Sequence, residues 1–515
     1  MYILCLGSEY FHQALAGLGH SVISPPHEDG YPLDVFFNQL TDRPDLVLYT
    51  EHLGKHAWPD GLDKIEVPKI YYAVDTPINF WWQKHFAGLF DICYVDQKPY
   101  VSQLQAIGQE ARWLPVAVNA AAYKSPFKEE DQSKIYDFGF VGVVNEKVRT
   151  KRSRLIQQLS GRFSLKSTGS HKDGWVGPED SAALYRQSRL ILNENLFPGV
   201  TTRMFEAMAS GAVLFTEKAG GDLGELFMPG EDFAWFEPQE LFEAAEYWLS
   251  DEARLKKVAA RAQEKVFDFH DIKHRAEVVL SDASSLVGLS QAKKGAEAWD
   301  LMGRTLFWTA LRWPAETGKE RLLRAEQLFL KAAEESHLSP EGKFMLGHIA
   351  RMKGEVERAE MLLGRALDEG YARAALGLGI LAMSLNKTDE AARWLGSFTG
   401  LGSDFPKLVP GVLHFEAAVA IAGRLVALGE IITPGFSLVS HDPALWTAFE
   451  YYLSAHQSKP ENLEVGKALS GILMNCGAPA EAMEVAAATL SHHPDDEPLS
   501  RIYSQAARAS YLSLN

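Results

Sequence analysis

The 515-residue sequence has few cysteines, no excess of positive charge and no long apolar run. The three cysteines, Cys5, Cys93 and Cys476, are far apart, and two of them lie in apolar, strand-like segments. We therefore expect buried thiols rather than disulfides or metal ligands, and a reducing compartment. The 51 basic and 67 acidic residues give a net charge of -16, which argues against nucleic acid or an anionic membrane as the main partner.

Neither a signal peptide nor a membrane span is expected. The chain starts directly with a strand-like run at Met1, without a basic n-region or a cleavage site. The most apolar helical run, residues 417–432, contains Arg424 and Glu430 and falls short of a membrane span. These features predict a cytoplasmic protein.

Two kinds of motif are also missing. No Gly-x-Gly-x-x-Gly follows the first predicted strand, which disfavours a nicotinamide-dependent dehydrogenase. No Cys and His cluster has metal-ligand spacing, and the paired His492 and His493 lie in a polar terminal turn where solvation explains them. We therefore expect neither a metal nor a resident cofactor.

The length and the hydrophobic pattern predict about three domains. Residues 1–130 and 131–285 each alternate short apolar runs with helical or loop segments, which is typical of a parallel α/β sheet. Residues 286–515 read as helices only. Strands are predicted at residues 2–6, 46–49, 70–73 and 92–95, and then at 138–141, 164–167, 190–193, 212–215 and 233–236.

Small residues recur at a regular period in the helical part. Ala325 and Ala359 are 34 residues apart, Ala391 follows 32 residues later, and Ala448 and Ala482 are again 34 apart. This spacing is close to the tetratricopeptide period, and such repeats stack helix pairs into a superhelix with a concave binding surface. We favour binding of a protein or peptide, while the alternatives are padding for the other domains and a dimer contact.

The segment from residue 193 to 225 is the most informative stretch. It predicts a strand end, a loop with Pro and Gly, and a short helix over residues 203–210 that Thr201 or Thr202 caps and Gly211 ends. Free backbone N–H groups and the helix dipole favour an anion at such a helix start. The segment therefore predicts a phosphate-binding loop.

The run Arg203-Met-Phe-Glu206-Ala-Met-Ala-Ser-Gly211 resembles the donor-site signature of GT-B glycosyltransferases, in particular the CgeB-like, group-1 type. The resemblance covers residues 131–280 well and the first 130 weakly. It implies two Rossmann-like domains, a nucleotide-sugar donor on the second of them, and a Glu206 side chain that binds ribose or sugar hydroxyls. The alternative is a structural helix in which Arg203 and Glu206 form a surface ion pair.

Two features bear on the type of transfer. Retaining relatives have a second Glu where this chain has Pro198, and Glu194 and Asn195 are out of register, so the stereochemical outcome stays open. The chain also lacks an Asp-x-Asp pair, the metal-diphosphate clamp of the other large transferase fold. This absence agrees with metal-independent transfer.

Further donor-binding residues are predicted at the first loop of the second domain. A turn at Gly142 precedes a basic helix start, and the resemblance implies that this loop approaches the donor diphosphate and that its basic residues neutralise it. The alternative is a solvated basic surface. The basic residues are Lys147, Arg149, Lys151, Arg152 and Arg154, of which we select Arg149 and Arg152. The complete predicted donor-binding set is Glu206, Arg203, Arg149, Arg152, Asn193, Thr202 and Gly142.

Polar residues at strand ends of the first domain are candidate catalytic groups. Asp75 follows a predicted strand, and Pro77 forces an extended turn that leaves the carboxylate at the edge of the sheet. Asp75 or His52 is expected to act as general base on an acceptor hydroxyl, while Arg203 stabilises the departing nucleotide. The alternatives are an N-cap role for the aspartate and a packed or solvated histidine.

Two contacts between the parts of the chain and the behaviour of a truncated chain are also expected. Trp81 and Trp82 are expected to fill an interdomain contact rather than to stack on a sugar. A helix within residues 251–280 is expected to cross back to the first domain. A chain that ends near Ser285 should keep donor binding, unless the later helices cover an apolar face.

Together these features predict a GT-B glycosyltransferase that uses a nucleotide sugar and carries a tetratricopeptide-like module. Because a repeat module suits a polypeptide acceptor, we favour Ser/Thr O-glycosylation of a protein, with flagellin a plausible target by analogy with modular transferases. The first alternative is transfer to a surface polysaccharide or spore-coat glycan. The second is a catalytically silent scaffold that binds a protein partner, and an oligomer is possible in each case.

Overall fold

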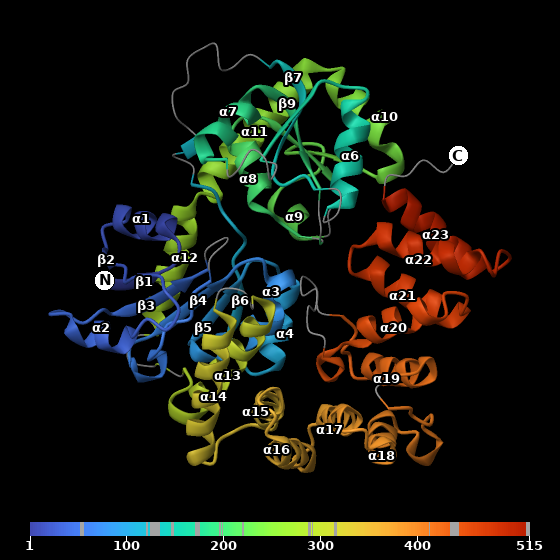
Figure 1. Ribbon diagram of the computed structural model, residues 1–515. Helices are drawn as coiled ribbons and strands as arrows, with labels where there is room; N and C mark the ends of the chain where they lie inside the picture. Colours follow the sequence, from blue (N-terminus) through green and yellow to red (C-terminus); the bar gives the residue numbers. More distant parts are fainter. Residues whose placement is uncertain are drawn as a thin grey trace.

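The computed structural model describes residues 1–51, 56–119, 122–123, 134–145, 149–169, 176–194, 197, 199–218, 221–286, 290, 292–313, 317–410, 412–432 and 442–510. It contains two parallel sheets flanked by helices and an arc of helices that starts beside the first sheet and ends beside the second domain (Figure 1). The predicted fold class, two Rossmann-like domains followed by an all-helical part, is confirmed. No described helix is long and apolar enough to cross a bilayer.

The first sheet has six parallel strands in the order β2-β1-β3-β4-β5-β6. Four of them match the predicted strands to within one residue: β1 (Tyr2–Leu6), β3 (Leu46–Thr50), β4 (Lys69–Ala73) and β5 (Ile92–Val95). The strands β2 (Ser21–Ile23) and β6 (Ala111–Trp113) were missed, because each has only three residues at a partly exposed edge. The sheet is flanked by α1 (Glu9–Gly17), α2 (Leu33–Gln39), α3 (Thr76–Phe86), α4 (Pro99–Ala106) and the short 3-10 helices η1 (Leu62–Lys64) and η2 (Ala87–Leu89).

The second sheet has five parallel strands in the order β11-β10-β9-β7-β8, and all five were predicted. They are β7 (Tyr136–Val141), β8 (Leu165–Thr168), β9 (Ser188–Asn193), β10 (Val213–Glu217) and β11 (Ala234–Phe236). Their continuous apolar runs reflect burial on both faces of the sheet. The covering helices are α6 (Thr150–Ser160), α7 (Pro178–Arg186), α8 (Thr202–Ala209), α9 (Gly221–Leu226), α10 (Leu241–Leu249) and α11 (Glu252–Phe269), with the 3-10 helix η4 (Pro238–Glu240) before α10.

The chain crosses between the two domains twice, and the crossings touch each other. After α11, the Ile272 N–H donates to the Val118 carbonyl at 2.9 Å, and the Val118 N–H donates to the His270 carbonyl at 3.3 Å. The next helix, α12 (Ile272–Ser285), buries Ala276 and Val279 against the first sheet. The predicted return helix is therefore confirmed, and the last helix of the predicted second domain packs on the first.

The helical part consists of successive pairs, α13 with α14, α15 with α16, α17 with α18, α19 with α20 and α21 with α22, and then α23. The five periodic alanines lie on the second helix of each pair and are fully buried: Ala325, Ala359, Ala391, Ala448 and Ala482. The predicted helix pairing is confirmed, while the tetratricopeptide assignment stays a prediction. The helices are α13 (Gly295–Arg312), α14 (Gly318–Glu334), α15 (Pro340–Met352), α16 (Val356–Asp368), α17 (Arg373–Ser384), α18 (Thr388–Thr399), α19 (Phe415–Ala427), α20 (Ala448–Ser458), α21 (Leu463–Asn475), α22 (Pro479–Leu490) and α23 (Glu497–Ala509), with the 3-10 helices η5 (Gly402–Asp404) and η6 (Pro443–Leu445).

The helical array contacts both Rossmann-like domains. At its beginning, α13 packs along α3, and at its far end α22 touches α6 while α23 touches η4. In Figure 1 the array therefore curves from the first domain round to the second.

One hydrophobic core joins the first sheet to the start of the array. Tyr71 of β4 and Phe329 of α14 belong to the same buried cluster. Trp81 lies 6.4 Å from each of the Trp308 and Trp313 rings, so the predicted interdomain contact is confirmed. The joint also includes ion pairs from Arg321 to Asp29 and from Arg324 to Asp60, each at 2.6 Å.

We expect a chain ending at Ser285 to aggregate, contrary to the expectation from sequence that it keeps donor binding. Each large apolar side chain of α13 and α14 that no longer covers the sheet removes about 1.5–3 kcal/mol of stabilisation. Size-exclusion chromatography and thermal unfolding measure this, with the full chain as the soluble control. A monomeric 1–285 chain that unfolds cooperatively would contradict the shared core.

Candidate active site

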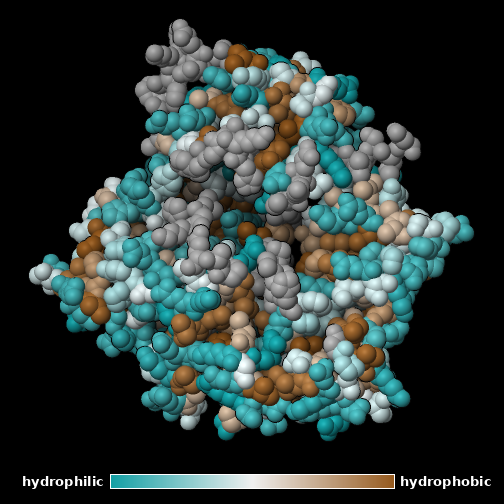
Figure 2. Space-filling model, in the orientation of Figure 1, coloured by the Kyte–Doolittle hydropathy of each residue, from teal (hydrophilic) through white to brown (hydrophobic). Residues whose placement is uncertain are grey.

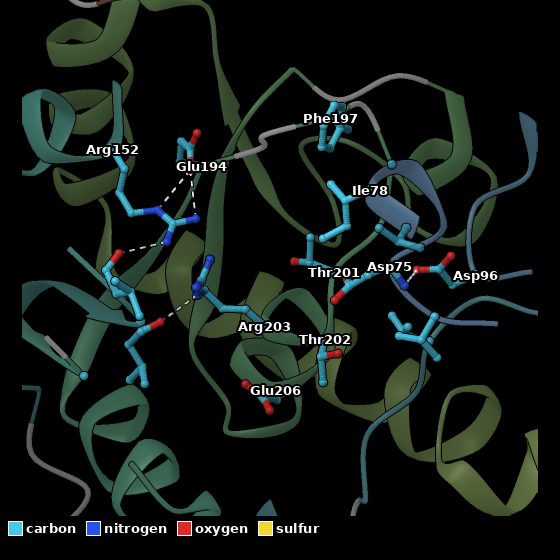
Figure 3. A pocket seen from close by; sticks show the side chains of 18 of the residues that line it. Asp75, Ile78, Asp96, Arg152, Glu194, Phe197, Thr201, Thr202, Arg203 and Glu206 are labelled. Atoms are coloured by element: carbon cyan, nitrogen blue, oxygen red, sulfur yellow. Dashed lines mark hydrogen bonds and ion pairs between the residues drawn. The ribbon is translucent and has the colours of Figure 1, made fainter. Parts of the chain in front are cut away.

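A cavity of about 760 Å³ lies between the carboxyl ends of the two sheets. One wall comes from the loops after β4 and β5, and the other from the loops after β7 and β9 and from the start of α8 (Figure 3). Parallel α/β sheets bind ligands in the crevice outside the carboxyl ends of their strands. The cavity is therefore the candidate active site.

Arg203, in the first turn of α8, is held in place against the second sheet. Its Nε donates to the Val141 carbonyl at 2.9 Å, and its Nη1 donates to Oδ1 of Asn193 at 3.2 Å. The guanidinium lies 4.5 Å from the centre of the Phe140 ring. Only glycine fits at Gly142, because a Cβ there would lie 2.6 Å from Nη2 of Arg203 and the backbone φ is +147°. These contacts fix a positive charge on the cavity wall.

Asn193 positions other groups from behind the cavity wall. It is fully buried, and its Nδ2 donates to Oγ1 of Thr216 at 3.1 Å while its Oδ1 also accepts from Thr201 at 3.3 Å. Thr202, by contrast, lines the cavity at the first residue of α8. Because first-turn N–H groups lack intrahelical partners, this helix start favours an anion. Asn193 was predicted to bind the donor, but the structure places it behind Arg203.

Arg149 and Arg152 both line the cavity at the start of α6. Nε and Nη2 of Arg152 each lie 3.0 Å from Oε2 of the buried Glu194. Burial lowers the pKa of Arg152 to about 10, while the charge of Glu194 raises it. Lys151 pairs instead with Glu217 at 2.6 Å. Glu194, out of register with the family motif, is therefore the counter-charge of Arg152.

Glu206 lies one turn further along α8 and also lines the cavity. Its Oε2 accepts a hydrogen bond from the Tyr185 hydroxyl at 3.4 Å, and the Tyr123 hydroxyl donates to the same carboxylate. Burial raises the pKa of Glu206, while the bond from Tyr123 and the charge of Arg203 lower it. No ion pair joins Arg203 to Glu206 in the described part of the chain, so the alternative of a surface ion pair is wrong.

Asp75 follows β4 and has a left-handed backbone, with φ +53°. It stands at the N-cap position of α3 but makes no side-chain capping bond. The Asp96 carboxylate takes that role, since it accepts from the Asp75 N–H at 2.9 Å, the Thr76 N–H at 3.1 Å and the Thr76 hydroxyl at 2.6 Å. The alternative is therefore met in position only: Asp75 is the N-cap residue of α3, but its carboxylate caps nothing and lines the cavity instead (Figure 3).

The surroundings of Asp75 raise the pKa of its carboxyl group. Burial raises the pKa of Asp75 to about 6, the negative charge of Asp96 adds to the rise, and the positive charge of Arg149 lowers it. Asp75 lies inside the cavity, where surrounding atoms desolvate its carboxylate, but the residue stays accessible to solvent through the open cleft. A carboxylate that is reachable and has a pKa near the working pH is suited to general base catalysis.

Two contacts that sequence reasoning missed join the domains at the cavity. Gln97 exchanges hydrogen bonds with the Val200 backbone, at 2.8 Å from Nε2 to the carbonyl and 3.1 Å from the N–H to Oε1. The Lys98 N–H donates to Asp222 at 3.2 Å, and the Lys98 ammonium pairs with Glu225 at 2.6 Å. The partners are more than 100 residues apart in the chain, so no local pattern identifies them.

Four residues named from the sequence lie outside the described residues: His52, Lys147, Asn195 and Pro198. The role of His52 as a base therefore stays a prediction. The described ranges contain no group of three or more His, Cys, Asp or Glu placed to hold a metal ion.

Comparisons with known proteins match part of the chain. A family model described as "Glycosyl transferase-like" matches residues 149–281, which include Arg149, Arg203 and Glu206. No curated protein sequence matches the chain.

Solved glycosyltransferase structures are similar to slightly more than half of the chain at low identity. Sucrose-phosphate synthase from Thermosynechococcus elongatus is 11% identical, covers 56% of this chain and 99% of its own, and has a TM-score of 0.42. HepE from Anabaena, in complex with UDP and glucose, is 14% identical, and the match covers 56% of this chain and 100% of HepE with a TM-score of 0.39. A glycosyltransferase from Rickettsia africae is 10% identical, and the match covers 56% of this chain and 99% of the other with a TM-score of 0.38.

We expect the Asp75 carboxyl to titrate near pH 6 and to respond to its charged neighbours. Arg149→Ala should raise this pKa, because it removes a positive charge that favours the carboxylate, and Asp96→Asn should lower it. Carbon-13 NMR of the labelled side chain follows the titration, and Arg162→Ala on the outer surface is the control. A midpoint near 4 that neither variant moves would contradict the environment described for Asp75.

Proposed function

We propose that the protein is a glycosyltransferase that moves a sugar from a nucleotide-sugar donor to an acceptor hydroxyl, namely a Ser or Thr of a protein. The observation that supports this most is the division of charge in the cavity. Arg149, Arg203 and the start of α8 line one wall, and Asp75 lines the other. The match of residues 149–281 to the glycosyl transferase-like family covers the basic wall.

The donor lies on the basic wall in this proposal. Arg203 and Arg149 bind the diphosphate, together with the first-turn N–H groups of α8, and they offset the negative charge that grows as the nucleoside diphosphate leaves. Arg152 contributes less charge, because Glu194 already pairs with it. Glu206 accepts hydrogen bonds from ribose or sugar hydroxyls, a role it now serves for Tyr185.

The acceptor lies on the first-domain wall. The Asp75 carboxylate takes the proton of the acceptor hydroxyl, and the oxygen of that hydroxyl bonds to the anomeric carbon of the sugar. The bond from that carbon to the diphosphate oxygen breaks, and the nucleoside diphosphate leaves with the electron pair. The groups that carry these steps are side chains and backbone N–H groups, so we propose transfer without a metal.

A protein acceptor is favoured by the position of the helical array, whose helix pairs curve from the first domain to the second (Figure 1). A tetratricopeptide-like array offers an extended concave surface that suits a polypeptide. Recruitment by such a surface adds binding energy far from the reacting hydroxyl.

The proposal is tested by incubating the full chain with a panel of nucleotide sugars and measuring nucleotide release, with and without EDTA. We expect release with at least one donor, at the same rate in the chelator. A chain that releases no nucleotide and shows no thermal shift with any donor is a scaffold rather than an enzyme. Release that stops in EDTA and returns with a divalent ion would contradict metal-independent transfer.

We expect Arg203→Ala and Glu206→Ala each to lower turnover by about 100-fold, which corresponds to a lost charged contact of about 3 kcal/mol in the transition state. Arg162→Ala and Glu246→Ala are the matched controls, because this pair lies on the surface of the same domain, outside the cavity. Initial rates with the active donor measure the effect. Normal turnover in folded Arg203→Ala and Glu206→Ala would remove both residues from the site.

The rate of transfer should fall at low pH, because Asp75 becomes protonated there. Its pKa is about 6, and the base must be deprotonated, so kcat/KM for transfer falls about tenfold per pH unit below that value. Asp75→Asn should abolish this fall together with most of the transfer. A pH-independent rate between about 5 and 7, or an Asp75→Asn variant that transfers normally, would exclude Asp75 as the base.

A further inference from the structure

A second cavity of about 660 Å³ lies between the first domain and the helical array. Its walls are α4 and Pro77 on one side and α20, α21 and the end of α19 on the other. Pro77 and Phe197 line both this cavity and the candidate active site, so the two spaces adjoin. Because Asp75 is two residues from Pro77, the junction lies beside the proposed base.

The array side of this cavity is aliphatic but accessible. Val426 and Ile431 are 40% and 37% exposed, although both are large apolar residues. Ile472 and Ala468 continue the apolar wall along α21. Figure 2 shows hydrophobic side chains on the inner side of the array, facing the gap between the domains. An accessible apolar wall next to a reaction site marks a binding surface rather than a packing surface.

Neutral polar groups lie among these apolar residues. Tyr100 and Gln103 of α4 face the cavity from one side, and Tyr452 and Asn475 from the other. In the described part of the chain none of these four side chains has a protein hydrogen-bond partner. The charged lining residue Lys467 is already paired with Asp496 at 2.8 Å. The cavity therefore offers apolar contact and neutral hydrogen-bonding groups.

We propose that this second cavity binds the stretch of polypeptide next to the acceptor Ser or Thr, through its uncharged, apolar residues. The inference rests on the proposed transferase function. A peptide has apolar side chains for the aliphatic wall and backbone amides that pair with the Gln103 and Asn475 amides. A glycan would leave many hydroxyls against aliphatic carbon without partners, and a lipid chain has no groups for the two amides.

Gly471 provides a way to fill the cavity without disturbing the fold. It lines the cavity from the middle of α21, and a Cβ placed there meets no atom within 4 Å. A larger side chain therefore points into open space, and it also removes the cost of a glycine inside a helix. Gly364 of α16 is the matched control, since a Cβ there also meets no atom within 4 Å and the residue lines neither cavity.

The test uses the full chain, its active nucleotide sugar, and a library of short synthetic peptides with one central threonine. We expect the wild type to label peptides with aliphatic or aromatic residues near the threonine. Gly471→Phe and Val426→Asp should lower kcat/KM for the best peptide by about tenfold or more. Nucleotide release without an acceptor should stay unchanged in both variants, and Gly364→Phe should behave as the wild type.

Three results would overturn the inference, and they separate it from the proposed function. If both variants label the peptides as fast as the wild type, the second cavity does not bind the acceptor. If the wild type hydrolyses the donor but labels only a glycan or lipid acceptor, the occupant is not a polypeptide. If no donor releases its nucleotide, the transferase proposal itself fails and this inference fails with it.

Discussion

The packing of α12 on the first sheet fixes the relation between the two Rossmann-like domains. The chain leaves the first domain near Val118 and returns beside it at Ile272, and the two crossings are hydrogen bonded to each other. Ala276 and Val279 then anchor α12 to the face of the sheet that α1 also covers. With both crossings joined on one side, the carboxyl ends of the two sheets face a common space, and neither domain forms the candidate site alone.

Within that space, the contacts of each arginine decide whether its charge can act on a ligand. Arg203 is held against the sheet by a backbone carbonyl, an amide oxygen and an aromatic ring, none of which carries a negative charge. Its positive charge acts on the Glu206 carboxylate without a direct ion pair between these two described residues, whereas Arg152 is directly paired with the buried Glu194. This difference gives the two arginines different roles in the proposed transfer. Arg203 binds the anionic donor, whereas Arg152 forms part of the cavity wall with Glu194.

The sequence predicted the parts of this structure that depend on local pattern. The buried strands and the helix from Thr202 were identified because their apolar runs and end residues are contiguous. The capping of α3 by Asp96 was not, because an aspartate follows each of β4 and β5 and only the register between the strands decides which one caps. The same limit applies to the Gln97–Val200 link and to the core shared by Tyr71 and Phe329, which join distant segments.

The array touches the first domain along α13 and the second at α22 and α23, so the three parts form a closed loop of contacts. A hinge rotation at the crossings near Val118 would change the distance between the two anchoring points of the array. The helix pairs would have to bend, or α22 would have to slide on α6. Because the array is anchored to both domains, its stiffness limits how far the two domains can separate. A mechanical load on the outer helices would be transmitted to the spacing of the cleft.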